Sequence, residues 1–494
     1  MPLGTISFRQ QPVETSLNLP AITNWTPIIG YMVYQDDISG LYYFKLILEV
    51  RLIDSTGTLV AKIKQRSNGF GSGARAMFDL KEIINSQLVS TIFDQNDDGV
   101  PFRTIHKLGV NDTTKVFSLN GDRNKDKWQI QEIYVKGYQQ YSSSESQIPS
   151  VNSVTNVDAS EFFMAASLPL MTARSTVVTT GSPATGFIQG DAFDKYQMSS
   201  STDCFLSDAK TYKTSIDFAV DGSVNYVYWN DETDTGDYHT LGYLNDNSNF
   251  SSDAKYMQIT YYDSSNSVIT TTYVLNGSAN GGMSPVSTNE DKERLLYYGC
   301  GPGNLEAQTV SGDGNAKPSN NSGWVYYRVR ATNFASASFM SKPYYFVRQD
   351  GSCKGFKIRR LAWVNSLGCY DYFNFKLKST QTIEVERKNY GSVLGTYDKS
   401  FWRYNNTQRG KATLNTSAVL KETITTDWLV EEEAYLMEKL IMSKEVHIVE
   451  NQDTEFTEAV LITNNSFVKK TKANDRLIQY TFEIEYANPI NTNS

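Results

Sequence analysis

Few residues in this chain have the types and spacing that enzyme chemistry requires. Histidine occurs only as His106, His239 and His447, and no His-Glu-x-x-His pair for zinc is present. A single histidine can still activate a serine or cysteine nucleophile, so hydrolysis is disfavoured but stays open. The sequence also lacks the Gly-x-Ser-x-Gly elbow of many hydrolases. Together these features predict a protein that is not an enzyme.

Two acidic runs, residues 94–99 (Asp94 to Gly99) and 122–126, are similar to the opening of a calcium-binding loop. Alternating carboxylates can direct oxygens at one cation, but such a loop needs a bidentate Glu at its twelfth position. That position is Ile105 in the first run, and the second run also lacks a closing ligand. We interpret both runs as solvated turns and predict no metal ligands.

Residues 69–73 and 299–303 are rich in glycine, but neither run carries the Lys-Ser/Thr pair of a phosphate-binding loop. We therefore expect tight turns there. Acid pairs for glycoside hydrolysis are defined by their separation in space, so the 54 acidic residues neither indicate nor exclude one. The sequence thus predicts no catalytic residues and no cofactor-binding residues.

The composition indicates folded domains with interaction surfaces. The 46 basic and 54 acidic residues leave a net charge of −8, which excludes a generally basic nucleic-acid wrapper but not a local basic patch. Tyrosine, with 31 residues, supplies half of the aromatic side chains and suits strand faces and protein interfaces. Tyrosine-rich surfaces also bind sugars, so this count does not choose between assembly and adhesion.

The cysteines, Cys204, Cys300, Cys353 and Cys369, form no Cys-x-x-Cys pair and are too sparse for a disulfide framework. We predict reduced and mostly buried thiols. The N-terminal residues show no signal peptide, and no run approaches about 20 apolar residues. We therefore expect synthesis in a cytoplasm and no membrane contact.

The elements that position all these residues are predicted to be mainly strands. In residues 1–140, Tyr42–Leu52 carries apolar side chains at alternate positions, which indicates a strand with one face on a core. A polar turn follows, and residues 59–63 return as the hairpin partner. One helix starts near Asp79, which can cap it, and its apolar stripe contains Leu80, Ile83, Ile84 and Leu88.

Residues 141–203 are rich in Ser and Thr and predict a linker, a long surface loop or an extended arm. Residues 204–348 again favour strands. Tyr256–Tyr262 and Val268–Leu275 form a second predicted hairpin, and further strands are expected over 324–330 and 344–348. Short strands separated by polar turns predict a β-sandwich-like domain.

Residues 349–494 predict an α+β domain. Apolar and polar residues alternate around Phe373, Ile383 and Phe482, and a helix is expected over Glu431–Met442. Several strands with one packed helix predict a compact domain. The predicted fold class is therefore mainly β and multi-domain, with β-sandwich-like domains and a C-terminal α+β domain that carries one clear helix.

Residues 376–409 interleave basic and aromatic side chains. Such a loop can contact nucleic acid or a phosphate-bearing surface. We favour a protein interface, because Tyr, Trp and Arg dominate interface hot spots. The basic members are Lys376, Lys378, Arg387, Lys388, Lys399, Arg403 and Arg409, and the aromatic members are Tyr390, Tyr397, Phe401, Trp402 and Tyr404.

A series of short motifs resembles a structural protein of tailed bacteriophages that infect Bacteroidota, including crAss-like phages. The C-terminal region carries most of the resemblance, while the other regions contribute Gln11-Pro12, Trp25 with Pro27-Ile28-Ile29, Phe78-Asp79-Leu80 and the run from Tyr298 to Leu305. Cys369 stands where the family pattern has a second glycine. The C-terminal motifs are the run from Leu361 to Phe373, Val385-Glu386-Arg387, Arg409-Gly410, Thr426-Asp427-Trp428-Leu429, Leu477-Ile478-Gln479-Tyr480 and Glu485-Tyr486-Ala487-Asn488.

The resemblance implies a virion component of the tail or neck with no catalytic residues. It implies a cyclic homo-oligomer below the portal, with twelvefold symmetry favoured over sixfold, bound to other tail and portal-proximal proteins. DNA in the channel would make only passive contact with such a ring. The alternative is a receptor- or carbohydrate-binding tail adhesin, although no heptad stalk is visible in the sequence. A glycan hydrolase of the tail is a third reading, and it requires two facing acids in a cleft.

Overall fold

A computed structural model of the chain confirms the mainly β, multi-domain fold. The chain divides into two compact units, residues 1–349 with 364–371, and residues 350–363 with 372–494. The structure describes residues 3–9, 21–22, 29–34, 38, 40–52, 55–69, 74–88, 114–117, 130–164, 196–198, 200–209, 223–246, 254, 256–275, 293–306, 317–332, 338–349, 356–429, 431–449, 457–464, 466, 468 and 478–488.

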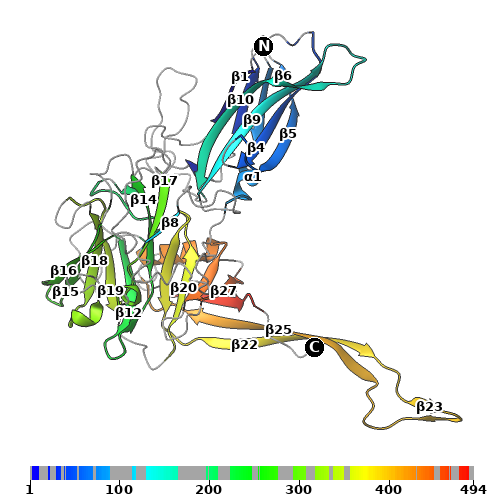
Figure 1. The fold of residues 1–494 in the computed structure, drawn as a ribbon. Helices are drawn as coiled ribbons and strands as arrows, with labels where there is room; N and C mark the ends of the chain where they lie inside the picture. The colour runs from blue at the N-terminus through cyan, green and yellow to red at the C-terminus, as the bar shows by residue number, and fades with distance from the viewer. Residues whose placement is uncertain are drawn as a thin grey trace. The chain divides into compact units, whose positions relative to one another are not determined.

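Two sheets face each other across a core in the N-terminal part of the first unit (Figure 1). The predicted hairpin is confirmed, since Tyr42–Leu52 is a strand paired antiparallel with the following one. One sheet contains β1 (Leu3–Arg9), β3 (Ile29–Tyr34), β7 (Ala74–Asp79) and β6 (Asn68–Gly69), and the other contains β2 (Ala21–Ile22), β10 (Ser150–Met164), β9 (Ile130–Ser142), β4 (Tyr42–Leu52) and β5 (Leu59–Arg66), each in this spatial order.

Strand β4 is buried on both faces, whereas its sequence indicates only one core-facing side. The apolar parity packs in the core as predicted, and the opposite parity is covered by an ion-pair network. The buried carboxylate of Glu49 accepts hydrogen bonds from Lys62 Nζ at 2.7 Å and Arg51 Nη2 at 3.0 Å. Burial raises the pKa of Glu49, but these bonds outweigh that cost and hold the pKa below its usual value.

The predicted N-terminal helix exists as α1 (Lys81–Asn85), which is a single short turn. Its backbone cap is Leu80, one residue later than expected, while Asp79 Oδ1 accepts the N–H of Lys81 at 3.1 Å. The expected Ser/Thr-rich linker also differs from the structure. Strand β9 runs through Ser142, and β10 occupies residues 150–164, because a long hairpin uses these residues as sheet partners.

The central part of the first unit is a sandwich of two further sheets, as the strand spacing predicts. Both sheets contribute to one core that is unusually rich in aromatic rings. The smaller sheet contains β11 (Gln197–Met198), β14 (Thr240–Asp246), β17 (Glu293–Gly299) and β8 (Thr114–Phe117). The larger contains β13 (Thr235–Gly236), β12 (Ser223–Asn230), β19 (Tyr344–Gln349), β18 (Tyr326–Thr332), β15 (Tyr256–Tyr262) and β16 (Val268–Leu275), beside α2 (Pro302–Glu306) and a 3-10 turn at Pro318–Asn320.

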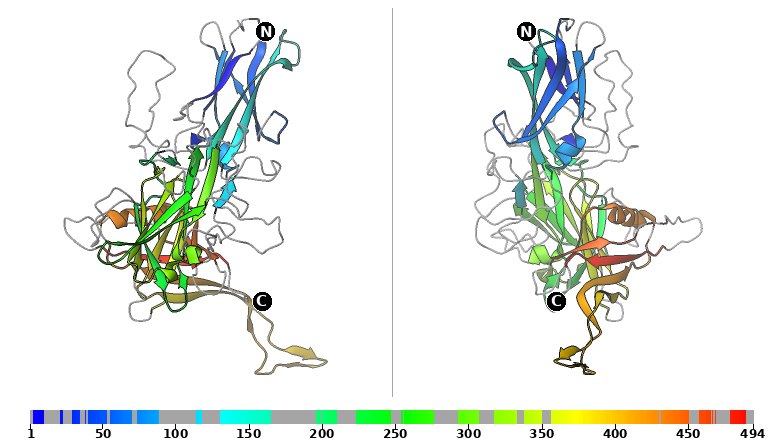
Figure 2. Two further views of the ribbon diagram at one scale, coloured as in Figure 1. Left: turned by 60° about the vertical axis from the view of Figure 1, so that its left-hand side comes forward. Right: turned by 90° about the vertical axis from the view of Figure 1, so that its right-hand side faces the viewer.

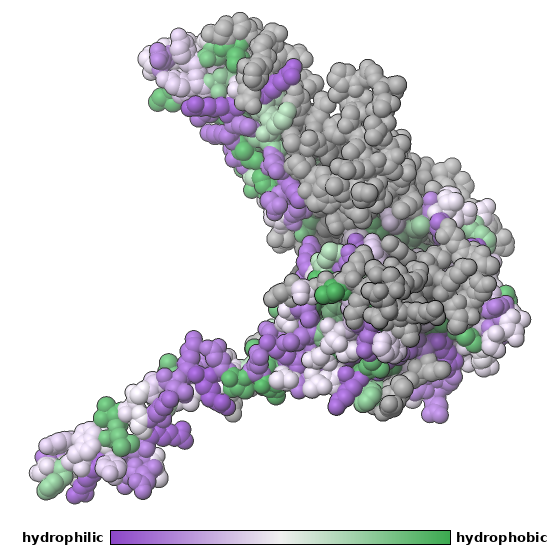
Figure 3. All heavy atoms as spheres, turned by 180° about the vertical axis from the view of Figure 1, so that it is seen from behind, coloured by the Kyte–Doolittle hydropathy of each residue, from purple (hydrophilic) through white to green (hydrophobic). Residues whose placement is uncertain are grey.

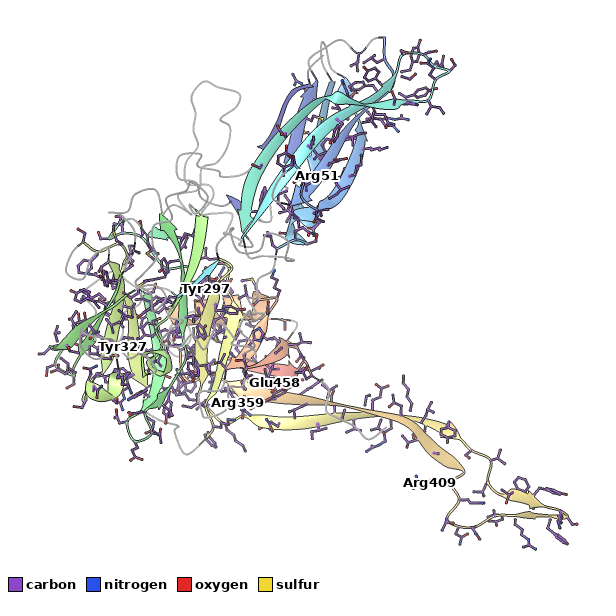
Figure 4. The ribbon with its side chains drawn as sticks, in the orientation of Figure 1. Arg51, Tyr297, Tyr327, Arg359, Arg409 and Glu458 are labelled. Atoms are coloured by element: carbon purple, nitrogen blue, oxygen red, sulfur yellow. The ribbon has the colours of Figure 1, made fainter. Side chains whose placement is uncertain are left out.

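Tyr327 lies at the centre of this core and gives a first testable prediction (Figure 4). Its ring stacks on Phe346 with centroids 4.8 Å apart, and its hydroxyl donates to the carbonyl of Cys300 at 2.8 Å. We expect Tyr327→Phe to lower the free energy of unfolding by about 1–2 kcal/mol, because a buried hydrogen bond is lost while the packing stays. Urea unfolding followed by circular dichroism measures this, and the exposed Tyr397→Phe is the matched control, with a change below about 0.5 kcal/mol.

The segment 364–371 is tied into the first unit by polar groups from residues 206–208. Buried Asp371 accepts hydrogen bonds from Ser207 Oγ at 2.5 Å and from the N–H of Asp208 at 2.8 Å. The Asp208 carboxylate in turn accepts the hydroxyl of Ser366 at 2.6 Å, and Asn365 Nδ2 donates to the carbonyl of Leu206 at 2.9 Å. These hydrogen bonds therefore hold together two segments that are distant in sequence, residues 206–208 and 364–371.

The second unit is built on a seven-stranded sheet with one long helix, and Figure 2 shows it from two further directions. The predicted helix is confirmed as α3 (Glu431–Met442), whose buried Ala434, Met437 and Leu440 pack in the sheet core. The strand order is β21 (Tyr370–Phe375), β20 (Arg359–Val364), β26 (Val446–Val449), β27 (Thr457–Ile462), β28 (Thr481–Tyr486), β25 (Lys411–Thr425) and β22 (Thr380–Gly391).

Candidate interaction arm

Two strands of the second unit continue far beyond its sheet as a two-stranded ribbon (Figure 1). Strand β25 pairs with β28 only over residues 421–425, whereas β22 and β25 pair with each other along their whole length. Residues 383–391 therefore extend roughly 30 Å past the sheet at the usual rise of a strand. We call residues 383–420 the arm.

The arm corrects the expectation of a compact C-terminal domain. The alternation around Ile383 and Val385 does mark a strand, but both side chains are exposed. Every residue of β22 is exposed, because no third strand or helix covers either face of the ribbon in the part of the chain that the structure describes. The extended arm is thus found at residues 383–420, and the sequence suggested residues 141–203 for it.

A second, smaller hairpin forms the tip of the arm. It consists of β23 (Thr396–Asp398) and β24 (Phe401–Arg403), joined by a tight turn in which Lys399 has a φ of 48°. Gly395 has a φ of 98°, and a Cβ there would lie 2.6 Å from the indole nitrogen of Trp402. A glycine is needed at this position because a side chain would displace Trp402 and strain the backbone. The tip is therefore a shaped element.

Large aromatic side chains at the tip are exposed. The exposed fractions are 71% for Tyr397, 67% for Phe401, 50% for Trp402 and 61% for Tyr404. The rings of Tyr397 and Trp402 make an edge-to-face contact, with centroids 6.3 Å apart. Side chains of this kind rarely stay in water on a monomeric protein, because each covers a large apolar area that is favourable to bury.

The outer part of the arm is also strongly basic. Residues 387–411 contain six basic residues and one acidic residue, a net charge of +5 in a chain of net charge −8. The rest of the chain therefore carries −13. Hydrophilic and hydrophobic side chains both cover the arm in Figure 3, and Arg409 lies toward its far end in Figure 4. The structure thus brings most of the basic and aromatic residues predicted over 376–409 onto one hairpin.

A buried ion pair anchors the base of the arm in the sheet. Glu422, on β25, has no exposed surface, and its carboxylate accepts hydrogen bonds from Arg359 Nε at 2.8 Å and Tyr486 Oη at 2.7 Å. Gln381, on the other strand of the ribbon, donates to the same carboxylate at 3.1 Å. Burial raises the pKa of Glu422, but these hydrogen bonds dominate and hold the pKa below its usual value.

The outer face of the sheet is acidic at the base of the arm. Lys421 Nζ lies 2.8 Å from Glu384, 3.7 Å from Glu483 and 4.0 Å from Glu485. Three carboxylates thus lie within 4.0 Å of one ammonium group, and strand alternation places a fourth, Glu386, on the same side of the ribbon. We call these four residues with Lys421 the acidic face, which carries a net charge of −3.

The structure places the other candidate residues in structural roles or outside the described ranges. His239 is buried against the rings of Tyr344 and Phe346, and His447 contacts Glu445. A Cβ on Gly301 would lie 2.4 Å from the carbonyl of Asp237, so that glycine makes a close backbone contact. Outside the described residues lie His106, Cys353, residues 70–73 and both acidic runs, 94–99 and 122–126.

Cys204, Cys300 and Cys369 form no disulfide bond in the described part of the chain, and the last two are buried. A Cβ on Gly242, in strand β14, would lie 2.4 Å from the sulfur atom of Cys369, so a glycine is needed there for the two segments to pack closely. Within the described ranges, no group of three His, Cys, Asp or Glu side chains is arranged to hold a metal ion.

Comparisons with known proteins add no family to this description. Neither a protein-family model nor a curated protein matches the chain. Among the residues that the structure describes, no helix is both long enough and apolar enough to span a membrane.

Proposed function

We propose that this protein is a structural subunit of a bacteriophage tail or neck. In this proposal the chain forms a cyclic ring below the portal and joins neighbouring tail proteins around the DNA channel. The observation that carries the proposal is the arm, since an exposed ribbon with an aromatic, basic tip has the composition of an interface and is not covered by any other described part of the chain. The ordered motifs of the C-terminal region support the phage assignment.

The geometry of the arm fits assembly better than solution chemistry. A two-stranded ribbon by itself is at best marginally stable in water, so its length is useful only where a partner covers it. Its anchor in the sheet, through Glu422 and β28, fixes the direction in which the tip is presented. A fixed direction suits a ring, in which every subunit must make the same contact with the next.

The second candidate is a carbohydrate-binding adhesin, favoured by the exposed Tyr397 and Trp402 rings, on which a sugar can stack. The two functions place the protein differently in a virion. A ring subunit surrounds the tail axis, whereas an adhesin lies at distal fibres.

The test is to locate the protein in purified virions of the phage that encodes it, by mass spectrometry of the particles and cryo-electron microscopy of the neck and tail. We expect density for this fold at the head–tail junction or along the tail, with cyclic symmetry that is twelvefold rather than sixfold. Density at distal fibres would favour the adhesin. Absence from the particle would overturn the virion assignment.

A further inference from the structure

The arm and the acidic face have properties that complement each other. The outer part of the arm, residues 387–411, carries +5 with exposed aromatic rings at its tip, and the acidic face carries −3 on the outer side of the same sheet. A tip cannot reach the face of its own molecule, because the two are separated along a ribbon whose strands pair continuously between them. The complement to each tip is therefore available on a second molecule.

We propose that the arm tip of one molecule docks on the acidic face of a second copy of this chain. The inference rests on the proposed assembly function and names the partner of the arm. Lys399 at the tip and Arg409 in the outer part of the arm are exposed, as is Glu386 on the face, and Glu483 is 47% exposed. Opposite charges on two surfaces steer and orient association, while the rings of Phe401 and Trp402 supply the apolar area.

This contact joins different surfaces of two identical molecules. A head-to-tail contact of this kind leaves one free tip and one free acidic face on any open assembly, so it continues until the assembly closes. It therefore produces a ring when the rotation between neighbours closes. The alternative is a contact between two identical tips. It would bring together the outer parts of two arms, residues 387–411, each of which carries +5.

The experiment is a charge exchange in the full-length protein, followed by sedimentation velocity at low and high salt. We expect the wild type to self-associate, and Lys399→Glu with Arg409→Glu to weaken association by about two orders of magnitude. Adding Glu386→Lys and Glu483→Lys to that variant should restore association, because the exchanged charges match again. Phe401→Ala with Trp402→Ala should weaken association at both salt concentrations.

Exposed residues away from both surfaces provide the control. Glu232→Lys changes the charge of the exposed turn between β12 and β13 and should leave association unchanged. All substituted residues lie on the surface, so we expect each variant to keep its fold. Thermal unfolding of each variant checks this. Association of the tip-reversed variant at wild-type strength would overturn the proposal, and so would failure of the four-residue exchange to restore it.

Binding to double-stranded DNA is measured in parallel by fluorescence anisotropy. Salt-sensitive DNA binding by the wild type that the tip-reversed variant loses, without self-association, would assign the tip to nucleic acid and overturn the proposal. Self-association in a protein that is absent from virions would refute the virion function alone. Presence in a virion ring without tip-to-face contact would refute only this inference.

Discussion

Replacement of Glu422 by alanine is expected to lower the free energy of unfolding of the second unit by about 3–5 kcal/mol. The buried carboxylate neutralises Arg359 and accepts hydrogen bonds from Tyr486 and Gln381. Its removal leaves a buried guanidinium without its counter-ion and the buried hydroxyl of Tyr486 without its acceptor. Such a loss costs far more than the removal of an exposed ion pair, because water cannot replace the missing groups.

Hydrogen–deuterium exchange with peptide mass spectrometry measures this effect where it arises. Protection of the amides in β25 and β28 near residues 421–425 and 481–485 should fall in Glu422→Ala. The matched control is Glu384→Ala, which removes an exposed carboxylate from Lys421 on the same ribbon and should cost less than about 1 kcal/mol. Equal effects of the two substitutions would show that the buried pair does not anchor the arm.

The ion pair between Glu422 and Arg359 also makes the stability of this region depend on pH. The pKa of Glu422 is lower in the folded protein than its usual value. A lowered pKa means that the carboxylate stabilises the fold above the unfolded pKa, which is about 4.3, and that this contribution is lost as the pH falls through the folded value. Protection in β25 should therefore decrease in acid, and Glu422→Ala should remove that dependence.

Replacement of Asp371 by asparagine is expected to have the opposite sign, making the protein more stable at pH 8. Burial, together with the nearby Asp208 carboxylate, raises the pKa of Asp371 to about 7, although hydrogen bonds from Ser207 and the Asp208 N–H act the other way. The folded protein thus holds a proton that the unfolded chain releases near pH 4. Stability conferred by this proton is present at low pH and is lost as the pH rises from about 4 to about 7.

Asparagine keeps the shape of Asp371 without the charge, so its gain should appear only at the higher pH. We expect Asp371→Asn to raise the free energy of unfolding by roughly 2–4 kcal/mol at pH 8 and to change it little at pH 4. Urea unfolding across this pH range measures the slope. Exposed Glu232→Gln is the control and should leave the slope unchanged, and a wild-type slope in Asp371→Asn would contradict the assignment.

Individual strands and helices were predictable from the sequence. The spacing of apolar side chains follows the repeat of the backbone, which is about two residues in a strand and about 3.6 in a helix. The bounds of Tyr42–Leu52, Tyr256–Tyr262 and Glu431–Met442 agree with the structure, since each carries a clear period of two or 3.6. The arm was predicted only in part. Alternation indicates that a strand has two different faces, but it does not indicate whether anything covers them, and Ile383 is 57% exposed among the described residues.

The buried polar groups were harder to predict, for two different reasons. Glu422 did leave a signal, because it stands between Leu420 and Ile424 at the apolar parity of β25, where a carboxylate is out of place. Asp371 left none. Its partner Ser207 is 164 residues away in the chain, and no local pattern records a contact between segments so distant.

The segment 364–371 has a consequence for how the protein matures during synthesis. The first unit otherwise ends at Gln349, so it must wait for residues that leave the ribosome later before its core is complete. Until then Gly242 faces a gap that Cys369 will fill, and Leu206 lacks the amide of Asn365. A fragment that ends at Gln349 should therefore aggregate, whereas the chain of residues 1–494 should not. The first unit therefore completes its fold only while the second unit is being synthesised.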